Sequence, residues 1–288
     1  MDRLEEVICT ALAEDLIGNC DLTSDHFVPA DTVGNGWIEA REEAVVSGLE
    51  ATVAVFRAVD ADLSLRILVS DGALVHAADR VLEIHGSAGS ILRAERTALN
   101  LLCHLAGVAT ATRAFVKATA EYGTRILCTR KTTPGLRILE VAAVHLGGGD
   151  AYRTNLSDSV LLKDNHIGML GGMSGVRARL EQIKSEDPNL AARLVSEGKI
   201  ETATMDDIAA AVELGWRQIL LDNFPVSEVQ TAVRRWGDRV FLEVSGGVSL
   251  ANVREYAATG VHAISIGAIT HSSRAMDFSL EVEWRIDS

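Results

Sequence analysis

Some residue types are scarce in this chain of 288 residues, and each scarcity excludes a class of protein. The chain has only 4 prolines against 24 glycines, and aromatic side chains make up 5% of it. With 48% hydrophobic and 23% charged residues, the composition is that of an ordinary globular protein, which excludes disordered and collagen-like chains. The length is comfortable for two domains, because a domain averages roughly 100–200 residues.

Cysteine is also scarce, and the four cysteines are Cys9, Cys20, Cys103 and Cys128. None of them is paired in a CxxC spacing, and none has a cluster of possible metal ligands beside it. We therefore expect small buried hydrophobic residues in a reducing compartment, not a disulfide framework or a metal site.

Long hydrophobic runs are absent as well: none approaches the roughly 18 residues that a membrane-spanning helix needs. The first residues, MDRLEEVICTALAEDL, contain acids where a signal peptide has basic residues before an apolar core. The sequence predicts a soluble cytoplasmic protein without a membrane partner.

Positive charge is in the minority, with 27 bases against 40 acids and a formal net charge of −13. This balance argues against a nucleic-acid partner. Six bases nevertheless fall close together, namely Arg125, Arg130, Lys131, Arg137, Arg153 and Lys163. Each alone could be an ordinary solvated side chain, but as a set they predict a small positively charged pocket for a small anionic ligand.

The two halves of the chain have different hydrophobic patterns. Residues 2–16 have a helical apolar stripe, and residues 36–86 contain short strand-like runs around a helical segment at 49–61, which predicts an α+β arrangement. A long helix is predicted from about residue 91 to residue 122, before Gly123.

After Gly123, short apolar runs alternate regularly with amphipathic helices. Such strand–helix units, in which the short runs are apolar on both faces, are typical of a parallel sheet covered by helices. We predict a closed or nearly closed α/β barrel instead of an open doubly wound sheet. No GxGxxG motif opens a helix after a strand, which disfavours dinucleotide binding.

Chemically active residues follow six of the predicted strands. In such barrels the loops at the strand ends converge on one mouth, where the chemistry takes place. In chain order the strand ends present Arg130, Lys131, Thr132 and Thr133; Lys163, Asp164, Asn165 and His166; Glu201; Asp222 and Asn223; Ser245, Gly246 and Gly247; and Gly267 and Ala268, with His271 close behind.

Two kinds of chemistry can be inferred from this ring. The small residues at the last two strand ends can present backbone N–H groups to a phosphate, although either set alone could simply form a tight turn. Glu201 and Asp222 could hold a magnesium-bound phosphate compound, or could form structural ion pairs with Lys131 or Lys163.

The cations suit a second anionic ligand. The cations that could bind this second ligand are Arg130, Arg153 and Lys163, together with Arg96. The guanidinium fork of arginine fits a carboxylate in bidentate fashion. The mouth is therefore predicted to bind one phosphorylated ligand with magnesium and one carboxylate.

At these residues the sequence resembles the quinolinate phosphoribosyltransferase family. The matching segments are ERTALNLL (95–102), TRKTTPGLR (129–137), GGG (147–149), LLKDNHI (161–167), ILLDNF (219–224), EVSGGVSLANVREYAATGV (243–261) and SIGAITHS (265–272). They occur in the family's order and spacing and cover nearly the whole chain, and the series RKTTPG, KDNH and LLDN is highly specific.

The resemblance implies a fold and a reaction. The fold is an N-terminal α/β sandwich domain (1–108), an incomplete α/β barrel of the type II phosphoribosyltransferase kind (109–270) and a C-terminal segment (271–288) that returns to the first domain. The reaction joins quinolinate to phosphoribosyl pyrophosphate (PRPP) with Mg²⁺, giving nicotinate mononucleotide, pyrophosphate and CO₂. The active site would be shared across a homodimer, and some members form hexamers.

The resemblance also assigns roles to residues. Arg96 of the partner subunit would reach the substrate carboxylates, while Thr129, Arg130, Tyr152, Arg153 and Lys163 would line the acceptor pocket. Lys131 and Lys163 would lie near the pyrophosphate, and Glu201 and Asp222 would hold Mg²⁺ and the ribose hydroxyls. The 5′-phosphate would be bound by Ser245, Gly246, Gly247, Ile266, Gly267 and Ala268, with His271 nearby.

One departure from the family concerns the acceptor. After GGG the family usually has Asn-His-Arg, whereas this chain has Ala151, Tyr152 and Arg153. Tyrosine is bulkier than histidine and neutral near pH 7, so a possible cation is lost. The acceptor is therefore quinolinate or, in a paralogous enzyme, a related heteroaromatic acid.

Two hypotheses from other classes remain open at this point. A Schiff-base aldolase would use Lys163 as its nucleophile, with its pKa lowered by desolvation. A non-catalytic protein would bind a nucleotide or an aromatic acid as a sensor, although the presence of Lys131, Lys163, Glu201 and Asp222 argues against an inactive site.

Overall fold

The computed structural model of the protein describes residues 3–285, and its contacts divide the chain into two compact units. The first unit contains the described residues up to Arg113, then Thr132–Gly148, and the described residues from Ile269 onward. The second unit contains Ala114–Lys131 and Gly149–Ala268. Residues 132–148, which the sequence placed in the barrel domain, are thus grouped with the first unit.

The first unit is built on a four-stranded antiparallel sheet of order β13-β1-β5-β3. The strands are β1 (Val33–Ala40), β3 (Ser64–Ile67), β5 (Arg80–Ser87) and β13 (Phe278–Arg285), and β2 (Ala44–Val45) pairs separately with β4 (Leu74–Val75). β13 pairs with β1 along its full length, so the C-terminal segment completes this sheet.

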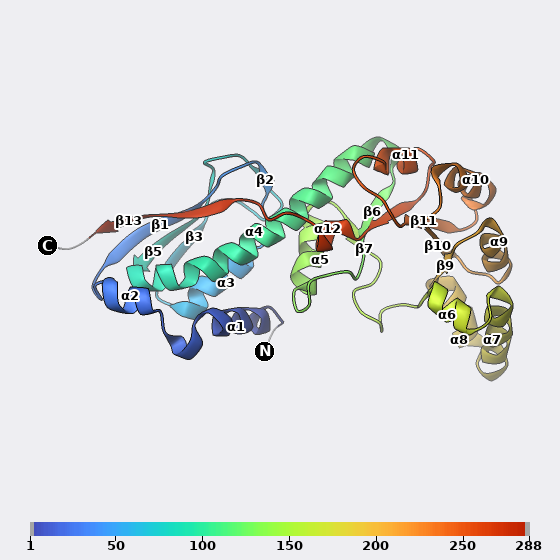
Figure 1. Ribbon diagram of the computed structural model, residues 1–288, viewed down its shortest axis with the longest axis horizontal. Coiled ribbons are helices and arrows are strands. Elements are labelled where there is room, and N and C mark those ends of the chain that lie inside the picture. The colour runs from blue at the N-terminus through green and yellow to red at the C-terminus, as the bar shows by residue number, and fades with distance from the viewer. Residues whose placement is uncertain (1–2, 286–288) are drawn as a thin grey trace. The chain divides into compact units, whose positions relative to one another are not determined.

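The first unit also contains helices, which Figure 1 labels. They are α1 (Arg3–Asp15), η1 (Ile17–Asn19), α2 (Leu22–Phe27), α3 (Leu49–Val59), α4 (Ala88–Thr119), α5 (Arg137–Leu146) and α12 (Ala268–His271). Ile38 and Leu82 of the sheet share one core cluster with Phe56 of α3 and Leu102 of α4, and none of the four is measurably exposed. The predicted helices at 2–16, 49–61 and 91–122 are confirmed, with ends shifted by a few residues, except that residue 2 lies outside the described residues.

The long helix α4 explains an apolar stretch for which the sequence predicted no membrane role. By length and composition alone, Ala88–Tyr122 could cross a membrane, but 56% of its most apolar window is buried inside the protein. The core helix of a globular unit has the same composition, because one of its faces must pack against the sheet.

The second unit contains a seven-stranded parallel sheet of order β7-β6-β12-β11-β10-β9-β8. Its strands are β6 (Arg125–Cys128), β7 (Asp150–Ala151), β8 (Leu161–Leu162), β9 (Lys199–Thr202), β10 (Gln218–Asp222), β11 (Phe241–Ser245) and β12 (Ala263–Ile266). This curled, incomplete barrel confirms the predicted fold class. The last strand of this sheet, β12, pairs with the first, β6, so the strands follow their chain order around the barrel, which is open between β7 and β8.

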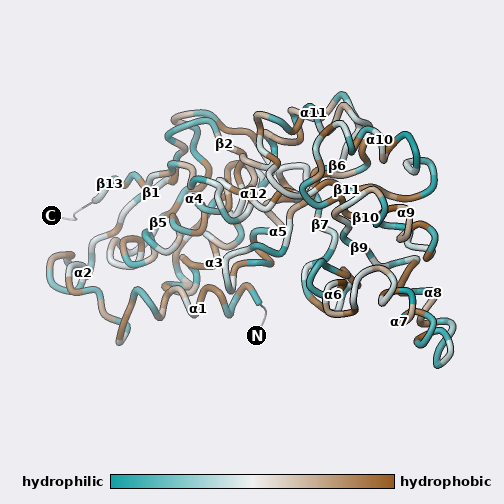
Figure 2. Tube along the Cα trace, turned by 45° about the vertical axis from the view of Figure 1, so that its right-hand side comes forward, coloured by the Kyte–Doolittle hydropathy of each residue, from teal (hydrophilic) through white to brown (hydrophobic). Residues whose placement is uncertain are grey.

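The second unit also contains helices. They are η2 (Ala120–Tyr122), α6 (Asp164–Met169), α7 (Met173–Glu186), α8 (Pro188–Glu197), α9 (Met205–Glu213), α10 (Val226–Trp236) and α11 (Val253–Ala257). The turn between α7 and α8 is hydrophilic, as Figure 2 shows. The predicted alternation of strand and helix is confirmed, although α6 and α8 were not predicted.

Two expectations about single residues were wrong. Cys9 and Cys20 are exposed, whereas only Cys128 is buried and Cys103 is half-buried. Cys9 directly follows Ile8, the buried residue of α1, and therefore lies on a different face of the helix. Glu201 lies within β9 and not after it, because this strand extends to Thr202.

Candidate active site

The carboxyl ends of the parallel strands present the predicted site residues in a definite spatial order. From one sheet edge to the other, they are Arg153 after β7, Thr129 to Lys131 after β6, Gly267 after β12, Ser245 to Gly247 at β11, Asp222 at β10, Glu201 in β9 and Lys163 after β8. The glycine loops are thus central, with cations at both edges. Arg96 on α4 and His271 on α12 belong to the first unit.

Glu201 and Asp222 lie on the neighbouring strands β9 and β10. Burial raises the pKa of Glu201, the negative charge of Asp222 raises it further, and Lys163 lowers it. The backbone N–H of Asp164 donates to Glu201 Oε1 at 3.4 Å. Over residues 3–285, neither carboxylate has a cation within ion-pair distance, so the structural ion pair with Lys131 or Lys163 is not formed.

This carboxylate pair fits a magnesium ion that is brought by a phosphate ligand. Its oxygen donors are of the kind that Mg²⁺ prefers, and their mutual repulsion would be relieved by a cation. In the described part of the chain, no group of three or more His, Cys, Asp or Glu side chains could hold a metal ion. One or two protein carboxylates together with phosphate oxygens is the usual arrangement for magnesium.

The loop after β10 is locked to the loop after β11. Asn223 has a left-handed backbone with φ of 56°, its N–H donates to the Ser245 carbonyl at 2.8 Å, and its Nδ2 donates to Asp222 Oδ2 at 2.8 Å. Gly246 has φ of +93°, and a Cβ there would lie 2.1 Å from Asn223 Oδ1. Both the left-handed backbone and the lack of room for a Cβ therefore require glycine at this position. Because the two loops are joined, their polar groups can bind the same substrate.

Two arginines lie near each other at the opposite edge. Burial lowers the pKa of Arg153, and the positive charge of Arg130 lowers it further. Arg153 Nη1 donates to the Ser159 carbonyl at 3.0 Å. A half-buried guanidinium beside a second cation is electrostatically unfavourable, and a bound anion would relieve the repulsion.

The loop between β6 and α5 is anchored by a buried carboxylate that the sequence analysis missed. Glu140 of α5 is fully buried, and it accepts the Thr133 N–H at 3.1 Å and lies 2.8 Å from His104 Nε2. Burial raises the pKa of Glu140, but these hydrogen bonds outweigh burial and hold the pKa below its usual value. The sequence feature that could have revealed Glu140 is a single acid on the otherwise apolar face of this helix.

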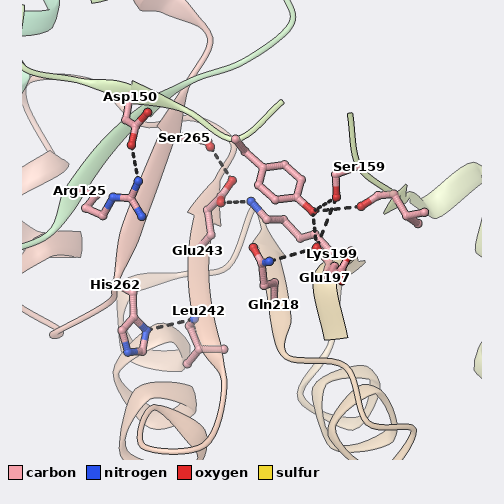
Figure 3. Close-up of polar contacts among 12 residues, drawn as sticks. Arg125, Asp150, Ser159, Glu197, Lys199, Gln218, Leu242, Glu243, His262 and Ser265 are labelled. Atoms are coloured by element: carbon pink, nitrogen blue, oxygen red, sulfur yellow. Dashed lines mark hydrogen bonds and ion pairs between the residues drawn. The ribbon is translucent and has the colours of Figure 1, made fainter. Parts of the chain in front are cut away.

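A second buried charge cluster lies inside the parallel sheet. Lys199 of β9 and Glu243 of β11 form an ion pair, and their side chains are only 1% and 2% exposed (Figure 3). Ser265 of β12 also donates to Glu243, and Arg125 pairs with Asp150 nearby. The sequence analysis missed the pair of Lys199 and Glu243 because neither residue stands at the carboxyl end of its strand, where chemically active residues were sought.

The aldolase hypothesis finds no suitable lysine here. Lys163 is exposed, whereas an amine that forms a Schiff base needs desolvation or a neighbouring cation to lower its pKa. Lys199 is desolvated, and burial does lower its pKa, but it lies at the first residue of its strand and is paired with Glu243.

Tyr152 has all of its polar contacts within the second unit. Its hydroxyl oxygen lies 2.7 Å from Ser159 Oγ and 3.2 Å from each of the carbonyl oxygens of Val160 and Glu197. Lys199 Nζ lies 3.5 Å from the centroid of its ring. Burial raises the pKa of Tyr152, so the phenol remains neutral at physiological pH.

Family models and curated relatives of similar sequence identify the family of this chain. The family models "Quinolinate phosphoribosyl transferase, N-terminal domain" and "Quinolinate phosphoribosyl transferase, C-terminal domain" match residues 21–121 and 108–281. The carboxylating nicotinate-nucleotide pyrophosphorylase of Mycobacterium leprae is 38% identical over 286 residues, which is 98% of each chain. A probable enzyme of the same name from Methanocaldococcus jannaschii is 36% identical over 92% of this chain and 93% of its own.

Solved structures agree with these relatives. The nicotinate-nucleotide pyrophosphorylase from Francisella tularensis superposes with a TM-score of 0.89 at 34% identity, covering 98% of this chain and 96% of that one. The structure of that name from Ehrlichia chaffeensis gives a TM-score of 0.89 at 35% identity, covering 97% and 98%. The chain, matched along nearly its whole length by sequence and by fold, belongs to the quinolinate phosphoribosyltransferase family.

Proposed function

We propose that this protein transfers the phosphoribosyl group of PRPP to quinolinate and decarboxylates the product, giving nicotinate mononucleotide, pyrophosphate and CO₂ in the biosynthesis of NAD. The observation that supports this most is the arrangement at the mouth of the parallel sheet. Cations stand at both sheet edges, a carboxylate pair stands on β9 and β10, and glycine loops stand between them. This is the charge pattern that a dicarboxylate and a magnesium-bound diphosphate require together.

On the acceptor side, Arg130, Arg153 and Lys163 bind the two carboxylates of quinolinate, with Thr129 beside them. The repulsion between Arg130 and Arg153 supports this assignment, because the anion that relieves it is the acceptor itself. Arg96 is supplied by the partner subunit of a homodimer, which could assemble further into a hexamer, and we place the enzyme in the cytoplasm.

On the donor side, the loops after β11 and β12 bind the 5′-phosphate through Ser245 to Gly247 and Ile266 to Ala268, with His271 nearby. Lys131 and Lys163 face the pyrophosphate. Glu201 and Asp222 would hold Mg²⁺ and the ribose hydroxyls. When bound, the metal would neutralise charge on the diphosphate.

Electrostatics is sufficient for this reaction. Displacement at the anomeric carbon passes through an oxocarbenium-like state in which negative charge builds on the departing pyrophosphate, and fixed lysines stabilise that charge. The pyridine nitrogen attacks, the bond to pyrophosphate breaks, and the nitrogen becomes cationic. Loss of the 2-carboxylate as CO₂ then leaves its electron pair on the ring beside this cation, and the ring carbon takes up a proton. No covalent nucleophile is needed.

The test is release of pyrophosphate from PRPP and Mg²⁺ with quinolinate as acceptor, with mass detection of the products. Nicotinate and other pyridine carboxylates run in parallel. We expect that, among the acids tested with PRPP and Mg²⁺, only quinolinate gives nicotinate mononucleotide. A nucleotide formed only from another acid would contradict quinolinate as the acceptor, and tight binding without turnover would identify a sensor.

A further inference from the structure

The parallel sheet is open between its edge strands β7 and β8, and we call the line between them the seam. In the part of the chain that the structure describes, no strand ladder joins these two edges. Arg153 follows β7 and Lys163 follows β8, so two of the cations that we assign to the acceptor stand on opposite sides of the seam. Their separation depends on whatever contacts cross it.

The hydroxyl of Tyr152 makes such a contact. Tyr152 directly follows β7, and its oxygen lies 2.7 Å from Ser159 Oγ, 3.2 Å from the Val160 carbonyl and 3.2 Å from the Glu197 carbonyl. Val160 immediately precedes β8, and Glu197 ends α8 just before β9. A single phenol therefore connects the end of one edge strand to the beginnings of β8 and β9 on the other side.

The ring of Tyr152 is held separately from its hydroxyl. Lys199 Nζ lies 3.5 Å from the ring centroid, and this lysine is itself paired with the buried Glu243. A cation that is removed from water interacts strongly with an aromatic face. Phenylalanine at position 152 would keep this ring contact and lose only the contact across the seam.

Ser159 links Tyr152 to Arg153. Its Oγ is bonded to the Tyr152 hydroxyl, and its carbonyl accepts from Arg153 Nη1 at 3.0 Å. The positive charge of Arg130 repels Arg153 and the negative charge of Asp158 attracts it, and the hydrogen bond to the Ser159 carbonyl fixes the direction of Nη1. A displacement of Ser159 would therefore displace the guanidinium that faces the acceptor.

We propose that Tyr152 is a positioning residue for the acceptor acid: by holding Ser159 across the seam, it fixes the separation of Arg153 and Lys163 and so selects an acid with two adjacent carboxylates. This inference rests on the proposed function, because it assumes that these two cations bind the acceptor. It gives Tyr152 a task that does not require contact with the substrate.

Steady-state kinetics of Tyr152→Phe test the proposal. We expect KM for quinolinate to rise roughly five- to tenfold, the worth of about one hydrogen bond, while KM for PRPP and kcat change by less than about twofold. Ser159→Ala should raise the quinolinate KM in the same way. The double variant should be no worse than the more affected single variant, because both substitutions break one link.

A matched control separates this role from a general effect on packing. Tyr256→Phe removes another phenol hydroxyl that donates to a backbone carbonyl, that of Phe224 at 3.0 Å. Phe224 follows β10, which is not an edge strand and does not border the seam. We expect it to leave the quinolinate KM unchanged. An unchanged KM in Tyr152→Phe, or an equal rise of both KM values, would overturn the inference.

Hydrogen exchange on the protein without added substrates supplies a readout that does not depend on the reaction. Tyr152→Phe should speed exchange of the backbone amides in residues 153–163 relative to wild type and to Tyr256→Phe, and equal exchange would contradict the proposal. If wild type fails to convert quinolinate, the proposed function is refuted. If wild type converts it and Tyr152→Phe behaves identically in both measurements, only this inference is refuted.

Discussion

At the scale of single residues, Glu201 is held in conditions that disfavour its charge. Burial and the neighbouring Asp222 both raise the pKa of Glu201, and no cation lies within ion-pair distance over residues 3–285. When folding raises the pKa of an acid, the free energy of unfolding decreases as the pH rises through that pKa. Such an arrangement is retained where function needs it, because active sites commonly sacrifice stability.

Glu201→Gln should therefore stabilise the protein while it destroys activity. Removing the charge relieves repulsion from Asp222, so we expect the midpoint of thermal unfolding near pH 7 to rise. Loss of a carboxylate that we propose faces the magnesium-bound diphosphate should lower kcat/KM by at least about 100-fold. Calorimetry and the pyrophosphate assay measure the two effects.

The exposed Glu181 of α7 offers a control for this substitution. Glu181→Gln should alter neither the unfolding midpoint nor the activity, since surface substitutions are usually within about 0.5 kcal/mol of neutral. A destabilised but active Glu201→Gln variant would show that Glu201 has a structural role and no part in the site.

At the scale of elements, the anchor between α4 and α5 holds the loop that follows β6. Buried Glu140 on α5 joins His104 of α4 to the backbone of Thr133, which lies two residues after Lys131. His104, Thr133 and Glu140 all belong to the first unit. One carboxylate thereby restrains the position of the RKTTPG segment.

The stability that Glu140 supplies should depend on pH. Its pKa is held below the usual value, so its contribution is present above that usual value, about 4.3, and is lost as the pH falls through the lowered pKa. Glu140→Gln should lower the free energy of unfolding by roughly 1–3 kcal/mol at pH 7, and the difference from wild type should shrink only as the pH falls below about 4.3. Urea unfolding at a series of pH values measures this.

Glu121→Gln is the matched control, because Glu121 is an exposed partner of Arg254 and its side chain is 58% exposed. It should cost no more than about 0.5 kcal/mol at any of these pH values. If Glu140→Gln has as small an effect, Glu140 does not anchor the loop.

At the scale of the whole molecule, the proposed site needs residues from different parts of the fold. The residues of the parallel sheet lie in the second unit, whereas Arg96 lies on α4 in the first. We assign Arg96 to the site of the partner subunit. In a symmetric dimer with shared sites, each subunit gives its Arg96 to the other and receives one in return.

This sharing predicts that two inactive variants restore activity when mixed. Arg96→Ala and Glu201→Gln should each be inactive alone. Unfolded and refolded together, half of the dimers should contain one chain of each kind, and in each of these one of the two sites is intact, giving roughly a quarter of wild-type activity. Assay of the mixture over a range of ratios measures this, and no recovery in mixed dimers would place Arg96 outside the partner's site.

The strand ends could be predicted well because their signals are local. A short apolar run followed by Lys163 and Asp164, or by Asp222 and Asn223, indicates a strand and the loop after it without any knowledge of the fold. The family motifs stand at these same places, so fold class and family were both predicted and are confirmed. The individual roles of the site residues, the magnesium ion and the homodimer remain predictions.

The sequence by itself determined the alternation of strands and helices, the polar groups at the strand ends and the family, because each depends on neighbouring residues or on ordered motifs. Only the tertiary structure decided that the barrel is open between β7 and β8, that Lys199 and Glu243 form a buried pair, and that Tyr152 crosses the seam to Ser159. These facts depend on which distant segments pack together. A side chain's partner across a sheet is set by strand order and register, which one strand's own residues do not specify.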